Sequence, residues 1–373
     1  MPHAGWVPGA PDVLTAPSGR NRPARRPSRE VSRLRLGVVG CGAVTERYHL
    51  PALLASPDIR IVAFADPAAE RARALAARAD GALALSSHEE LAGRVDAVLI
   101  AAPNAVHEPI AVPLLAAGVH LLVEKPMART TAECDRMLAA AAAGRAVLAV
   151  GHDFRHFPVA GLAKALFAAG LLGSIRRVDL RQSASSRWPS VSTAVLSPEA
   201  GGGVLIDFGV HLLDLLLWWL GDLRPVGCRD DAEGGIETEC ELELELADGA
   251  PVHVTLSRTR ALRDTVMVEG QRGTLELGVF EPALIRLTPA GGTAAVVGSV
   301  PDADFERAPL ATVFGRQLAD FAAAVRGEHP PAVTGEDGRR VVALAESCYA
   351  MRRPLRTAWD FPDAYAVVGR TGP

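Results

Sequence analysis

Between residues 34 and 150 the sequence alternates short, wholly apolar stretches with longer stretches of helical periodicity. We expect strands at residues 34–39, 60–65, 95–101, 119–123 and 146–150, and helices at residues 44–54, 68–78, 110–117 and 132–143. Strands that are apolar on both faces indicate a parallel sheet covered by helices on both sides. Right-handed crossovers between such strands give a doubly wound α/β domain.

After Gly151 the pattern changes. A predicted helix at residues 159–168 and a polar segment rich in Ser and Arg at residues 180–197 precede an apolar helix at residues 204–220. Residues 241–246 then alternate glutamate with leucine, and residues 252–256, 265–268, 274–277 and 284–287 continue this period of two. The alternation predicts a largely antiparallel sheet with one open face. A last helix at residues 338–351, with Thr334 as its N-cap, completes a second, α+β domain.

A chain of 373 residues is long enough for two domains. We place the doubly wound domain at residues 34–155 and the α+β domain at residues 156–353, followed by a C-terminal tail at residues 354–373. Residues 1–33 are rich in Pro, Gly and Arg, and we expect a disordered extension. Arg25-Arg26 also suggests twin-arginine export, but the apolar residues that follow fit a first strand and no small-residue cleavage site comes after them.

Charge and cysteine content limit the partners and the compartment. The net charge of −4 provides no basic surface for nucleic acid. The most apolar stretch, residues 204–220, contains Asp207, His211 and Asp214, so we expect no membrane span. The five cysteines are odd in number and include no Cys-x-x-Cys pair. They argue against a disulfide framework or a structural zinc site and favour a reducing cytoplasm.

A glycine-rich turn joins the first predicted strand to the first predicted helix. Gly40 permits a tight turn, and Gly42 lets the backbone of Ala43 and Val44 approach a pyrophosphate at the helix N-terminus. Thr45 stands where this pattern usually has glycine or alanine. Because a turn of this kind after a strand is typical of a Rossmann domain, the sequence predicts a bound dinucleotide.

Asp66 bears on the kind of dinucleotide. It closes the second predicted strand, where an acidic side chain hydrogen-bonds the ribose hydroxyls. Its carboxylate would repel a 2′-phosphate, so we expect NAD as the cofactor. NADP stays open as an alternative, since Arg71 and Arg73 follow closely enough to reach a 2′-phosphate.

Three further segments resemble motifs of a known family. They are Ala101-Ala102-Pro103-Asn104-Ala105-Val106-His107, Val123-Glu124-Lys125-Pro126, and residues 201–214, which contain Asp207-Phe208-Gly209-Val210-His211. Together with the glycine turn they resemble the Gfo/Idh/MocA family, named for glucose–fructose oxidoreductase and inositol dehydrogenase. The resemblance extends over residues 34–353. It implies NAD(P)-dependent redox chemistry at a ring carbinol carbon of a sugar, aminosugar or cyclitol.

The resemblance also implies which residues form the site. Besides the glycine turn and Asp66, cofactor contacts are expected from Ala102, Pro103, Asn104, His107, Glu124 and Lys125. Pro126 is expected to follow a cis bond. Lys125, Asp207 and His211 match the catalytic positions. Residues 151–155 resemble the segment after the last strand of the first domain, although Asp153 stands where the family often has Asn or Gln.

The residue types suit hydride transfer from a secondary alcohol, because a base must take the hydroxyl proton and a cation must stabilise the developing charge. We expect His211 to be the general acid/base, Lys125 the electrostatic stabiliser and proton partner, and Asp207 the orienting group. The roles of His211 and Lys125 can be exchanged. Of the 39 basic residues only Lys125 and Lys164 are lysines, and arginine cannot release a proton near neutral pH. Alternatively, Asp207 and His211 form a buried, mutually satisfied pair on one helix.

Substrate selection is expected from Arg187 and Trp188, which come before the glycine run at residues 201–203, and from Arg155. An exposed Trp stacks on a sugar face, and Arg binds hydroxyl or phosphate groups. Lys125, Asp207 and His211 are expected to contact the substrate as well. We expect no metal, because His152 and His156 lack a recognisable third ligand.

Two other functions remain open. A glycosidase that retains NAD would use transient oxidation to assist elimination, and a non-catalytic protein of this fold would only sense the cofactor. The presence of Lys125, Asp207 and His211 argues against the sensor. The leucine face of the alternating sheet suggests a subunit interface in a homodimer or homotetramer.

Overall fold

The computed structural model describes residues 33–183, 203–233, 235–278, 285–293, 295–298 and 302–355. The N-terminal extension and the C-terminal tail predicted above lie outside these residues, except at Arg33, Pro354 and Leu355. Within the described part, no helix is long and apolar enough to cross a membrane.

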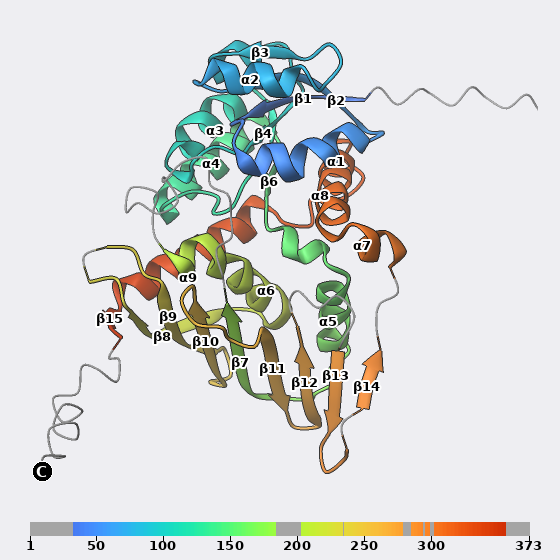
Figure 1. The fold of residues 1–373 in the computed structure, drawn as a ribbon. Helices are drawn as coiled ribbons and strands as arrows, with labels where there is room; N and C mark the ends of the chain where they lie inside the picture. Colours follow the sequence, from blue (N-terminus) through green and yellow to red (C-terminus); the bar gives the residue numbers. More distant parts are fainter. Residues whose placement is uncertain are drawn as a thin grey trace, which may run out of the picture. The chain divides into compact units, whose positions relative to one another are not determined.

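Six parallel strands form the first sheet, in the order β3-β2-β1-β4-β5-β6 (Figure 1). Their bounds are Leu34–Val39 (β1), Ile59–Ala65 (β2), Leu83–Leu85 (β3), Ala97–Ile100 (β4), His120–Val123 (β5) and Leu148–Val150 (β6). All described residues of β4 are buried, as expected for a strand covered on both faces. The predicted doubly wound fold is confirmed. β3 was not predicted, because three residues with one buried side chain carry no periodic signal.

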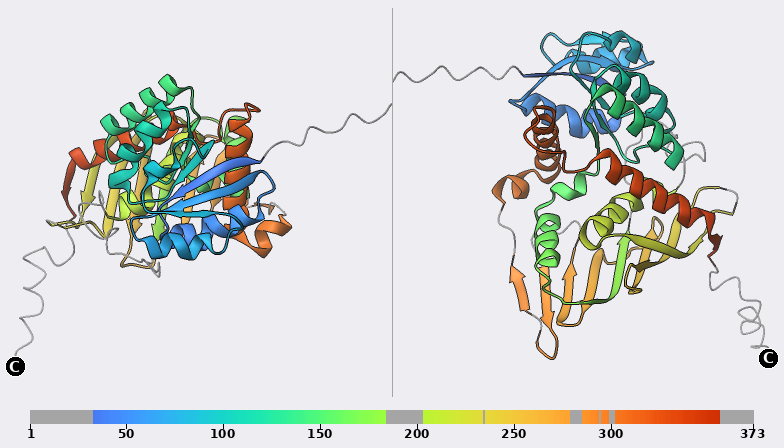
Figure 2. Two further views of the ribbon diagram at one scale, coloured as in Figure 1. Left: turned by 90° about the horizontal axis from the view of Figure 1, so that it is seen from above. Right: turned by 180° about the vertical axis from the view of Figure 1, so that it is seen from behind.

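Helices cover both faces of this sheet (Figure 2). α3 (His107–Ala116) and α4 (Thr131–Gly144) share one hydrophobic core with the sheet. α1 (Leu50–Ala55) and α2 (Ala69–Ala76) share the other. α1 directly follows a π-helical turn, Thr45–His49, so the helix predicted at residues 44–54 exists but is not regular throughout.

The second sheet has nine strands in the order β14-β13-β12-β11-β7-β10-β9-β8-β15. Their bounds are Ile175–Ser183 (β7), Leu223–Asp230 (β8), Glu239–Leu246 (β9), Pro251–Ser257 (β10), Thr265–Gly270 (β11), Gly273–Leu277 (β12), Ile285–Pro289 (β13), Ala295–Gly298 (β14) and Arg352–Pro354 (β15). Neighbours are antiparallel except β7 with β10 and β8 with β15. This confirms the predicted largely antiparallel sheet. Residues 180–183, predicted as part of a polar segment, instead end the central strand β7.

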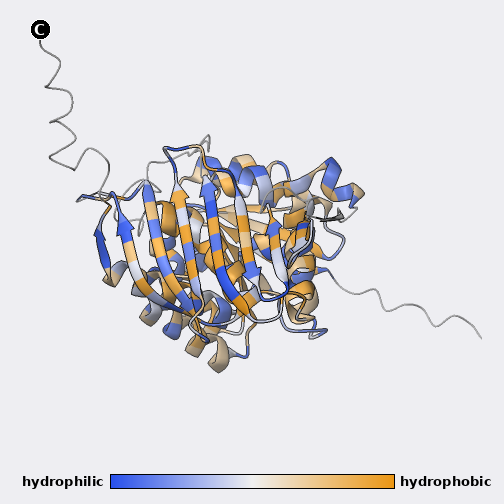
Figure 3. Cartoon of the chain, turned by 90° about the horizontal axis from the view of Figure 1, so that it is seen from below, coloured by the Kyte–Doolittle hydropathy of each residue, from blue (hydrophilic) through white to orange (hydrophobic). Residues whose placement is uncertain are grey.

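The leucine face of β9 was predicted as a subunit interface, and this is wrong for that face. Leu242, Leu244 and Leu246 are buried in the chain's own core. There they pack with α6 (Val210–Leu220) and α9 (Gly335–Ala350). Figure 3 shows the sheet from its uncovered side, and hydrophilic residues alternate with hydrophobic ones along the strands, as expected when successive side chains point to opposite faces. On β9 the glutamates alternate with the leucines, and Glu243 and Glu245 pair with arginines of β8.

The remaining helices connect the two sheets. α5 (Pro158–Ala168) packs against α6, and α7 (Ala303–Arg307) leads into α8 (Pro309–Val325). α8 falls in the range predicted for the second domain, but its Phe314, Leu318 and Phe321 belong to the core of the first sheet beside α1 and α2. α9 contacts α4 of the first domain as well as α6 and β8 of the second. Thr334 is its N-cap, as predicted, and accepts a hydrogen bond from the Asp337 N–H.

Candidate active site

The turn after β1 is the first part of the site. Gly40 has a φ of +93°, and a Cβ there would lie 2.4 Å from the carbonyl oxygen of Ala101, so this position requires glycine. The buried Thr45 hydroxyl donates a hydrogen bond of 2.6 Å to the Gly40 carbonyl. This contact explains why a threonine fits here. The turn lies between β1 and β4, where the strand order reverses and doubly wound sheets bind dinucleotides.

Asp66 holds this turn against the end of β2. Its Oδ2 accepts a hydrogen bond of 2.8 Å from the Cys41 N–H, and its Oδ1 accepts one of 2.8 Å from the Ala68 N–H. Each oxygen keeps a second lone pair for a ribose hydroxyl. Gly42, Ala43 and Val44 lie in the same turn, so the residues present fit a dinucleotide.

The loops after β4 and β5 are linked by His107. Its Nε2 lies 2.9 Å from the Ala102 carbonyl and its Nδ1 lies 3.0 Å from the Pro126 carbonyl. The ring is 1% exposed, and burial lowers its pKa. We expected His107 to contact the cofactor, but the structure gives it a supporting position that fixes the Ala102–Asn104 loop to the Lys125 loop.

Lys125 leaves β5 at the carboxyl edge of the sheet and is followed by the expected cis Pro126. The neighbouring Glu124 accepts a hydrogen bond from the Lys125 N–H, and its Oε1 lies 2.7 Å from Nε2 of the buried His49. Burial by itself would raise the pKa of Glu124, but His49 and the charge of Lys125 outweigh it and lower that pKa. Glu124 therefore anchors the backbone from which the Lys125 side chain projects.

The segment that carries Asp207 and His211 begins against a buried carboxylate. Glu237 is 1% exposed, and its side chain accepts hydrogen bonds from the Gly203 and Leu205 N–H groups at 3.1 and 3.0 Å. Tyr349 of α9 donates a third, of 2.6 Å. A carboxylate at a helix N-terminus satisfies N–H groups that have no partner within the helix.

Asp207 meets Lys125, which comes from a distant part of the chain. Lys125 Nζ lies 3.6 Å from Asp207 Oδ1 and also donates to the Asp207 carbonyl. Arg258, directly after β10, donates a hydrogen bond of 2.6 Å to Asp207 Oδ2. The Asp207 side chain is 43% exposed, so a carboxylate held by two cations faces outward.

His211 does not pair with Asp207, which corrects the predicted orienting role. The two positions lie four residues apart along a π-helical turn and the start of α6, but the Asp207 carboxylate is engaged by Lys125 and Arg258 instead. The nearest carboxylate is that of Asp153, whose Oδ1 lies 3.3 Å from His211 Nδ1. Burial, followed by the charges of Lys125 and His152, lowers the pKa of His211 well below its ordinary value.

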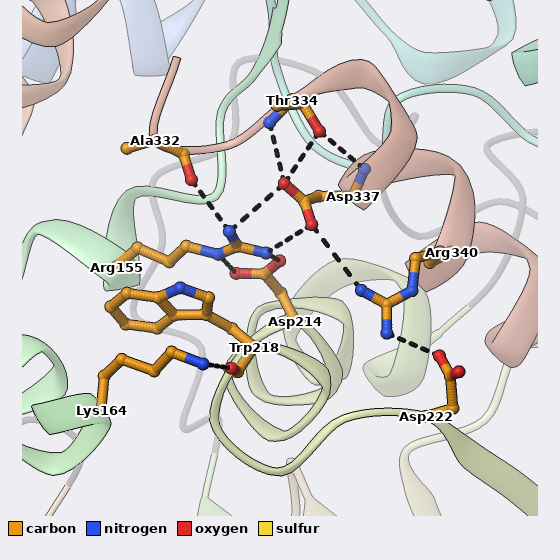
Figure 4. A network of polar contacts seen from close by, with 9 residues as sticks. All are labelled: Arg155, Lys164, Asp214, Trp218, Asp222, Ala332, Thr334, Asp337 and Arg340. Carbon is orange, nitrogen blue, oxygen red and sulfur yellow. Dashed lines mark hydrogen bonds and ion pairs between the residues drawn. The ribbon is translucent and has the colours of Figure 1, made fainter. Parts of the chain in front are cut away.

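Arg155, expected to bind substrate, is instead part of a buried ion-pair network (Figure 4). Its guanidinium donates two hydrogen bonds, of 2.6 and 2.8 Å, to Asp214. It also lies 3.3 Å from Asp337 and stacks over Trp218 at 5.2 Å. Only 4% of its side chain is exposed, so we no longer assign it to substrate binding.

Some predicted site residues cannot be placed, and some residues of the site were not predicted. Arg187 and Trp188 lie outside the described residues. Arg258 and Glu237 were missed, because each is a single polar residue beside a strand and no motif includes it. Asp153 was noted only as a departure from the family pattern. Among the described residues, no group of three or more His, Cys, Asp and Glu side chains is placed to hold a metal ion.

Family models match both parts of the chain. Residues 34–152 match the oxidoreductase family with an NAD-binding Rossmann fold, and residues 162–276 match the GFO/IDH/MocA C-terminal domain. A curated relative, the dTDP-3,4-didehydro-2,6-dideoxy-alpha-D-glucose 3-reductase of Streptomyces antibioticus, is 30% identical over 86% of this chain and 98% of its own length. The chain belongs to the Gfo/Idh/MocA family. This Gfo/Idh/MocA protein is therefore an NAD(P)-dependent oxidoreductase with an NAD-binding Rossmann domain.

Other similar proteins differ in the compounds that they are named for or were solved with. The rhizopine catabolism protein MocA of Rhizobium meliloti is 28% identical over 85% of this chain and 94% of its own length. Among solved structures, a 3-ketoreductase from Actinomadura kijaniata with NADP and TDP-benzene has a TM-score of 0.76 at 24% identity, covering 87% of this chain and 99% of that one. The WlbA dehydrogenase of Bordetella pertussis with NADH and UDP-GlcNAcA has a TM-score of 0.74 at 22% identity, covering 86% and 95%. These structures share the fold.

Proposed function

We propose that this protein interconverts a secondary alcohol and a ketone on the ring of a sugar, aminosugar or cyclitol. The observation that carries this proposal is the meeting of Lys125 with Asp207, four residues before His211, at the carboxyl edge of the dinucleotide-binding sheet. Curated relatives support the substrate class, because they include dTDP-sugar 3-reductases and a scyllo-inositol 2-dehydrogenase.

The site residues divide the work of such a reaction. His211 exchanges the proton of the substrate hydroxyl, and the Lys125 ammonium stabilises the negative charge that develops on that oxygen. Asp207, held between Lys125 and Arg258, keeps the ammonium in place and offers its exposed oxygen to a substrate hydroxyl. Bound NAD(P) supplies the hydride acceptor or donor. Ala102, Pro103 and Asn104 border its site together with Glu124.

NAD(H) is the proposed cofactor. Both Asp66 oxygens already accept backbone hydrogen bonds, which holds the carboxylate where a 2′-phosphate would have to lie. Arg71 favours NADP instead, because its positive charge acts on Cys41 in the glycine-rich turn and so lies near the cofactor site. Relatives use either cofactor, since the scyllo-inositol dehydrogenase is NADP(+)-dependent and the Bordetella dehydrogenase was solved with NADH.

A substrate screen tests the function. Sugars, aminosugars and inositols are offered with NAD+ or NADP+, and ketosugars, free or dTDP-linked, with NADH or NADPH, while absorbance of the reduced nicotinamide is followed. We expect turnover with at least one compound and a higher kcat/KM for the NAD(H) pair. Release of a free sugar from a glycoside without net NADH formation would show the NAD-retaining glycosidase instead. Cofactor binding without turnover of any compound would favour the sensor.

We further propose a homodimer or homotetramer that pairs the open faces of the nine-stranded sheets. The leucine face is occupied by helices of the same chain, which leaves the uncovered face seen in Figure 3 for a partner. Size-exclusion chromatography with light scattering should give at least twice the 39.2 kDa mass of one chain. A monomer at micromolar concentration would contradict this.

The cytoplasm is the proposed location. All five cysteines are buried thiols, as suits a reducing compartment.

A further inference from the structure

Asp153 lies directly beneath His211. It follows β6 in a short 3-10 helical turn, and 7% of the residue is exposed. Its Oδ1 lies 3.3 Å from His211 Nδ1, within ion-pair distance although not aligned as a hydrogen bond. Nδ1 is itself buried and makes no hydrogen bond to any other described group. A buried ring nitrogen without a partner is costly, so this carboxyl group is the one available to satisfy it.

The ring of His211 is held so that this nitrogen faces Asp153. Phe154 stacks on one side of the imidazole, with ring centroids 4.2 Å apart and planes 14° from parallel. The ring of His152 meets it edge-on, at 5.8 Å. A ring packed in this way cannot turn freely to exchange its two nitrogens.

We propose that Asp153 is the positioning residue that orients His211, fixing its Nδ1–H tautomer and sharing one exchangeable proton with it. The inference rests on the proposed function for its catalytic meaning. Asp153 takes the orienting role that was first predicted for Asp207, because Lys125 and Arg258 already engage the Asp207 carboxylate. When the Asp153 carboxylate accepts the Nδ1–H, the lone pair of Nε2 is left for the substrate hydroxyl.

The proton balance follows from this arrangement. In oxidation the substrate hydroxyl gives its proton to His211 Nε2 while the carbinol carbon gives its hydride to the bound cofactor, and the ketone forms. Nδ1–H stays directed at Asp153, whose negative charge stabilises the imidazolium. In reduction the same proton returns from Nε2 to the substrate oxygen.

The charges around this pair set its titration. The pair faces Glu124 and Lys125 after β5, His152 after β6 and Asp214 on α6. Burial, followed by the charge of Glu124, raises the pKa of Asp153 to about 7. Below this pH the pair holds an additional proton, which ketone reduction needs. Above it the pair is ready to accept one, which alcohol oxidation needs.

Asp153→Asn tests the inference through the pH dependence of kcat/KM. The amide has the same shape but cannot hold the shared proton, so the reduction profile should move to lower pH by at least about one unit, which is a roughly tenfold loss at pH 7. The loss should fall on kcat, with KM for the ketone little changed. Asp96→Asn, which removes a carboxylate beside Arg35 at the amino edge of the same sheet, should leave the profile unchanged. An unshifted profile in Asp153→Asn would overturn the inference.

A second measurement depends neither on activity nor on the Asp153→Asn variant. In wild-type protein with ¹⁵N-labelled histidine, the ring nitrogen shifts of His211, assigned with His211→Asn, report which nitrogen carries the proton. We expect protonated Nδ1 and bare Nε2 at pH 8. A proton on Nε2 at that pH would show the inference to be wrong even if the substrate screen succeeds. If the expected tautomer were found but no compound were turned over, only the proposed function would be ruled out.

Discussion

Lys125→Ala is expected to lower kcat/KM by about 10³-fold at pH 7, the size of loss typical when an oxyanion-stabilising donor is removed. The ammonium contacts the carboxylate and the carbonyl of Asp207 at the carboxyl edge of the sheet, the proposed meeting place of substrate and cofactor. Without it, the charge that develops on the substrate oxygen loses its nearest cation. Stopped-flow measurement of nicotinamide absorbance gives the rate, and fluorescence titration should show that NADH still binds.

The chain offers a matched control for this change. Lys164, the other lysine, donates to the Trp218 carbonyl and lies 5.8 Å above that indole ring, away from Asp207. Lys164→Ala should keep turnover within about twofold of wild type. Lys125→Arg retains the charge but should not restore the rate, because the guanidinium differs in shape and does not release a proton. Near-native turnover in both Lys125→Ala and His211→Ala would refute the site assignment.

Asp214→Asn should cost about 3–5 kcal/mol of unfolding free energy, as expected when one partner of a buried ion pair is removed. The Asp214 side chain is fully buried, and it accepts both hydrogen bonds that the Arg155 guanidinium directs at it. Asn can accept only through one oxygen and leaves a buried charge less compensated. Urea unfolding followed by circular dichroism measures the difference in midpoint.

Asp222→Asn is the control for this stability change. Asp222 belongs to the same network through Arg340 (Figure 4), but its side chain is 86% exposed. Exposed ion pairs contribute little, so the midpoint should hardly move. If Asp214→Asn unfolded at the same urea concentration as Asp222→Asn, the Arg155 network would not be a stabilising element of the fold.

The fold was predictable wherever hydrophobic periodicity was strong. β1 was predicted with its observed bounds, and the alternation at residues 241–246 predicted most of β9, although its leucine face was assigned to a partner and not to the chain's own core. α8 was not predicted at all, although its buried side chains follow helical spacing. Its buried residues pack on strands that come much earlier in the chain, and a local sequence pattern does not show such a contact.

The site was predictable as a set of residues and less so as a set of contacts. Motif spacing identified Lys125, Asp207 and His211, and the meeting of Lys125 with Asp207 is observed. The partner of His211 could not be predicted from helical spacing, because Lys125 and Arg258 engage Asp207 from distant parts of the chain, and the carboxylate beside His211 comes from the turn after β6. Arg155 was misassigned, since a sequence does not show that Asp214 and Asp337 will converge on the same guanidinium.

The position of α8 has a consequence for how the protein is made. A ribosome releases the strands of the nucleotide-binding half first, but one face of that half is completed by Phe314, Leu318 and Phe321. Until translation has passed these residues, the nascent chain presents an unfinished apolar surface to the cell. Maturation of the cofactor pocket is thereby coupled to synthesis of nearly the whole polypeptide, and a truncated product would be recognised by chaperones and proteases.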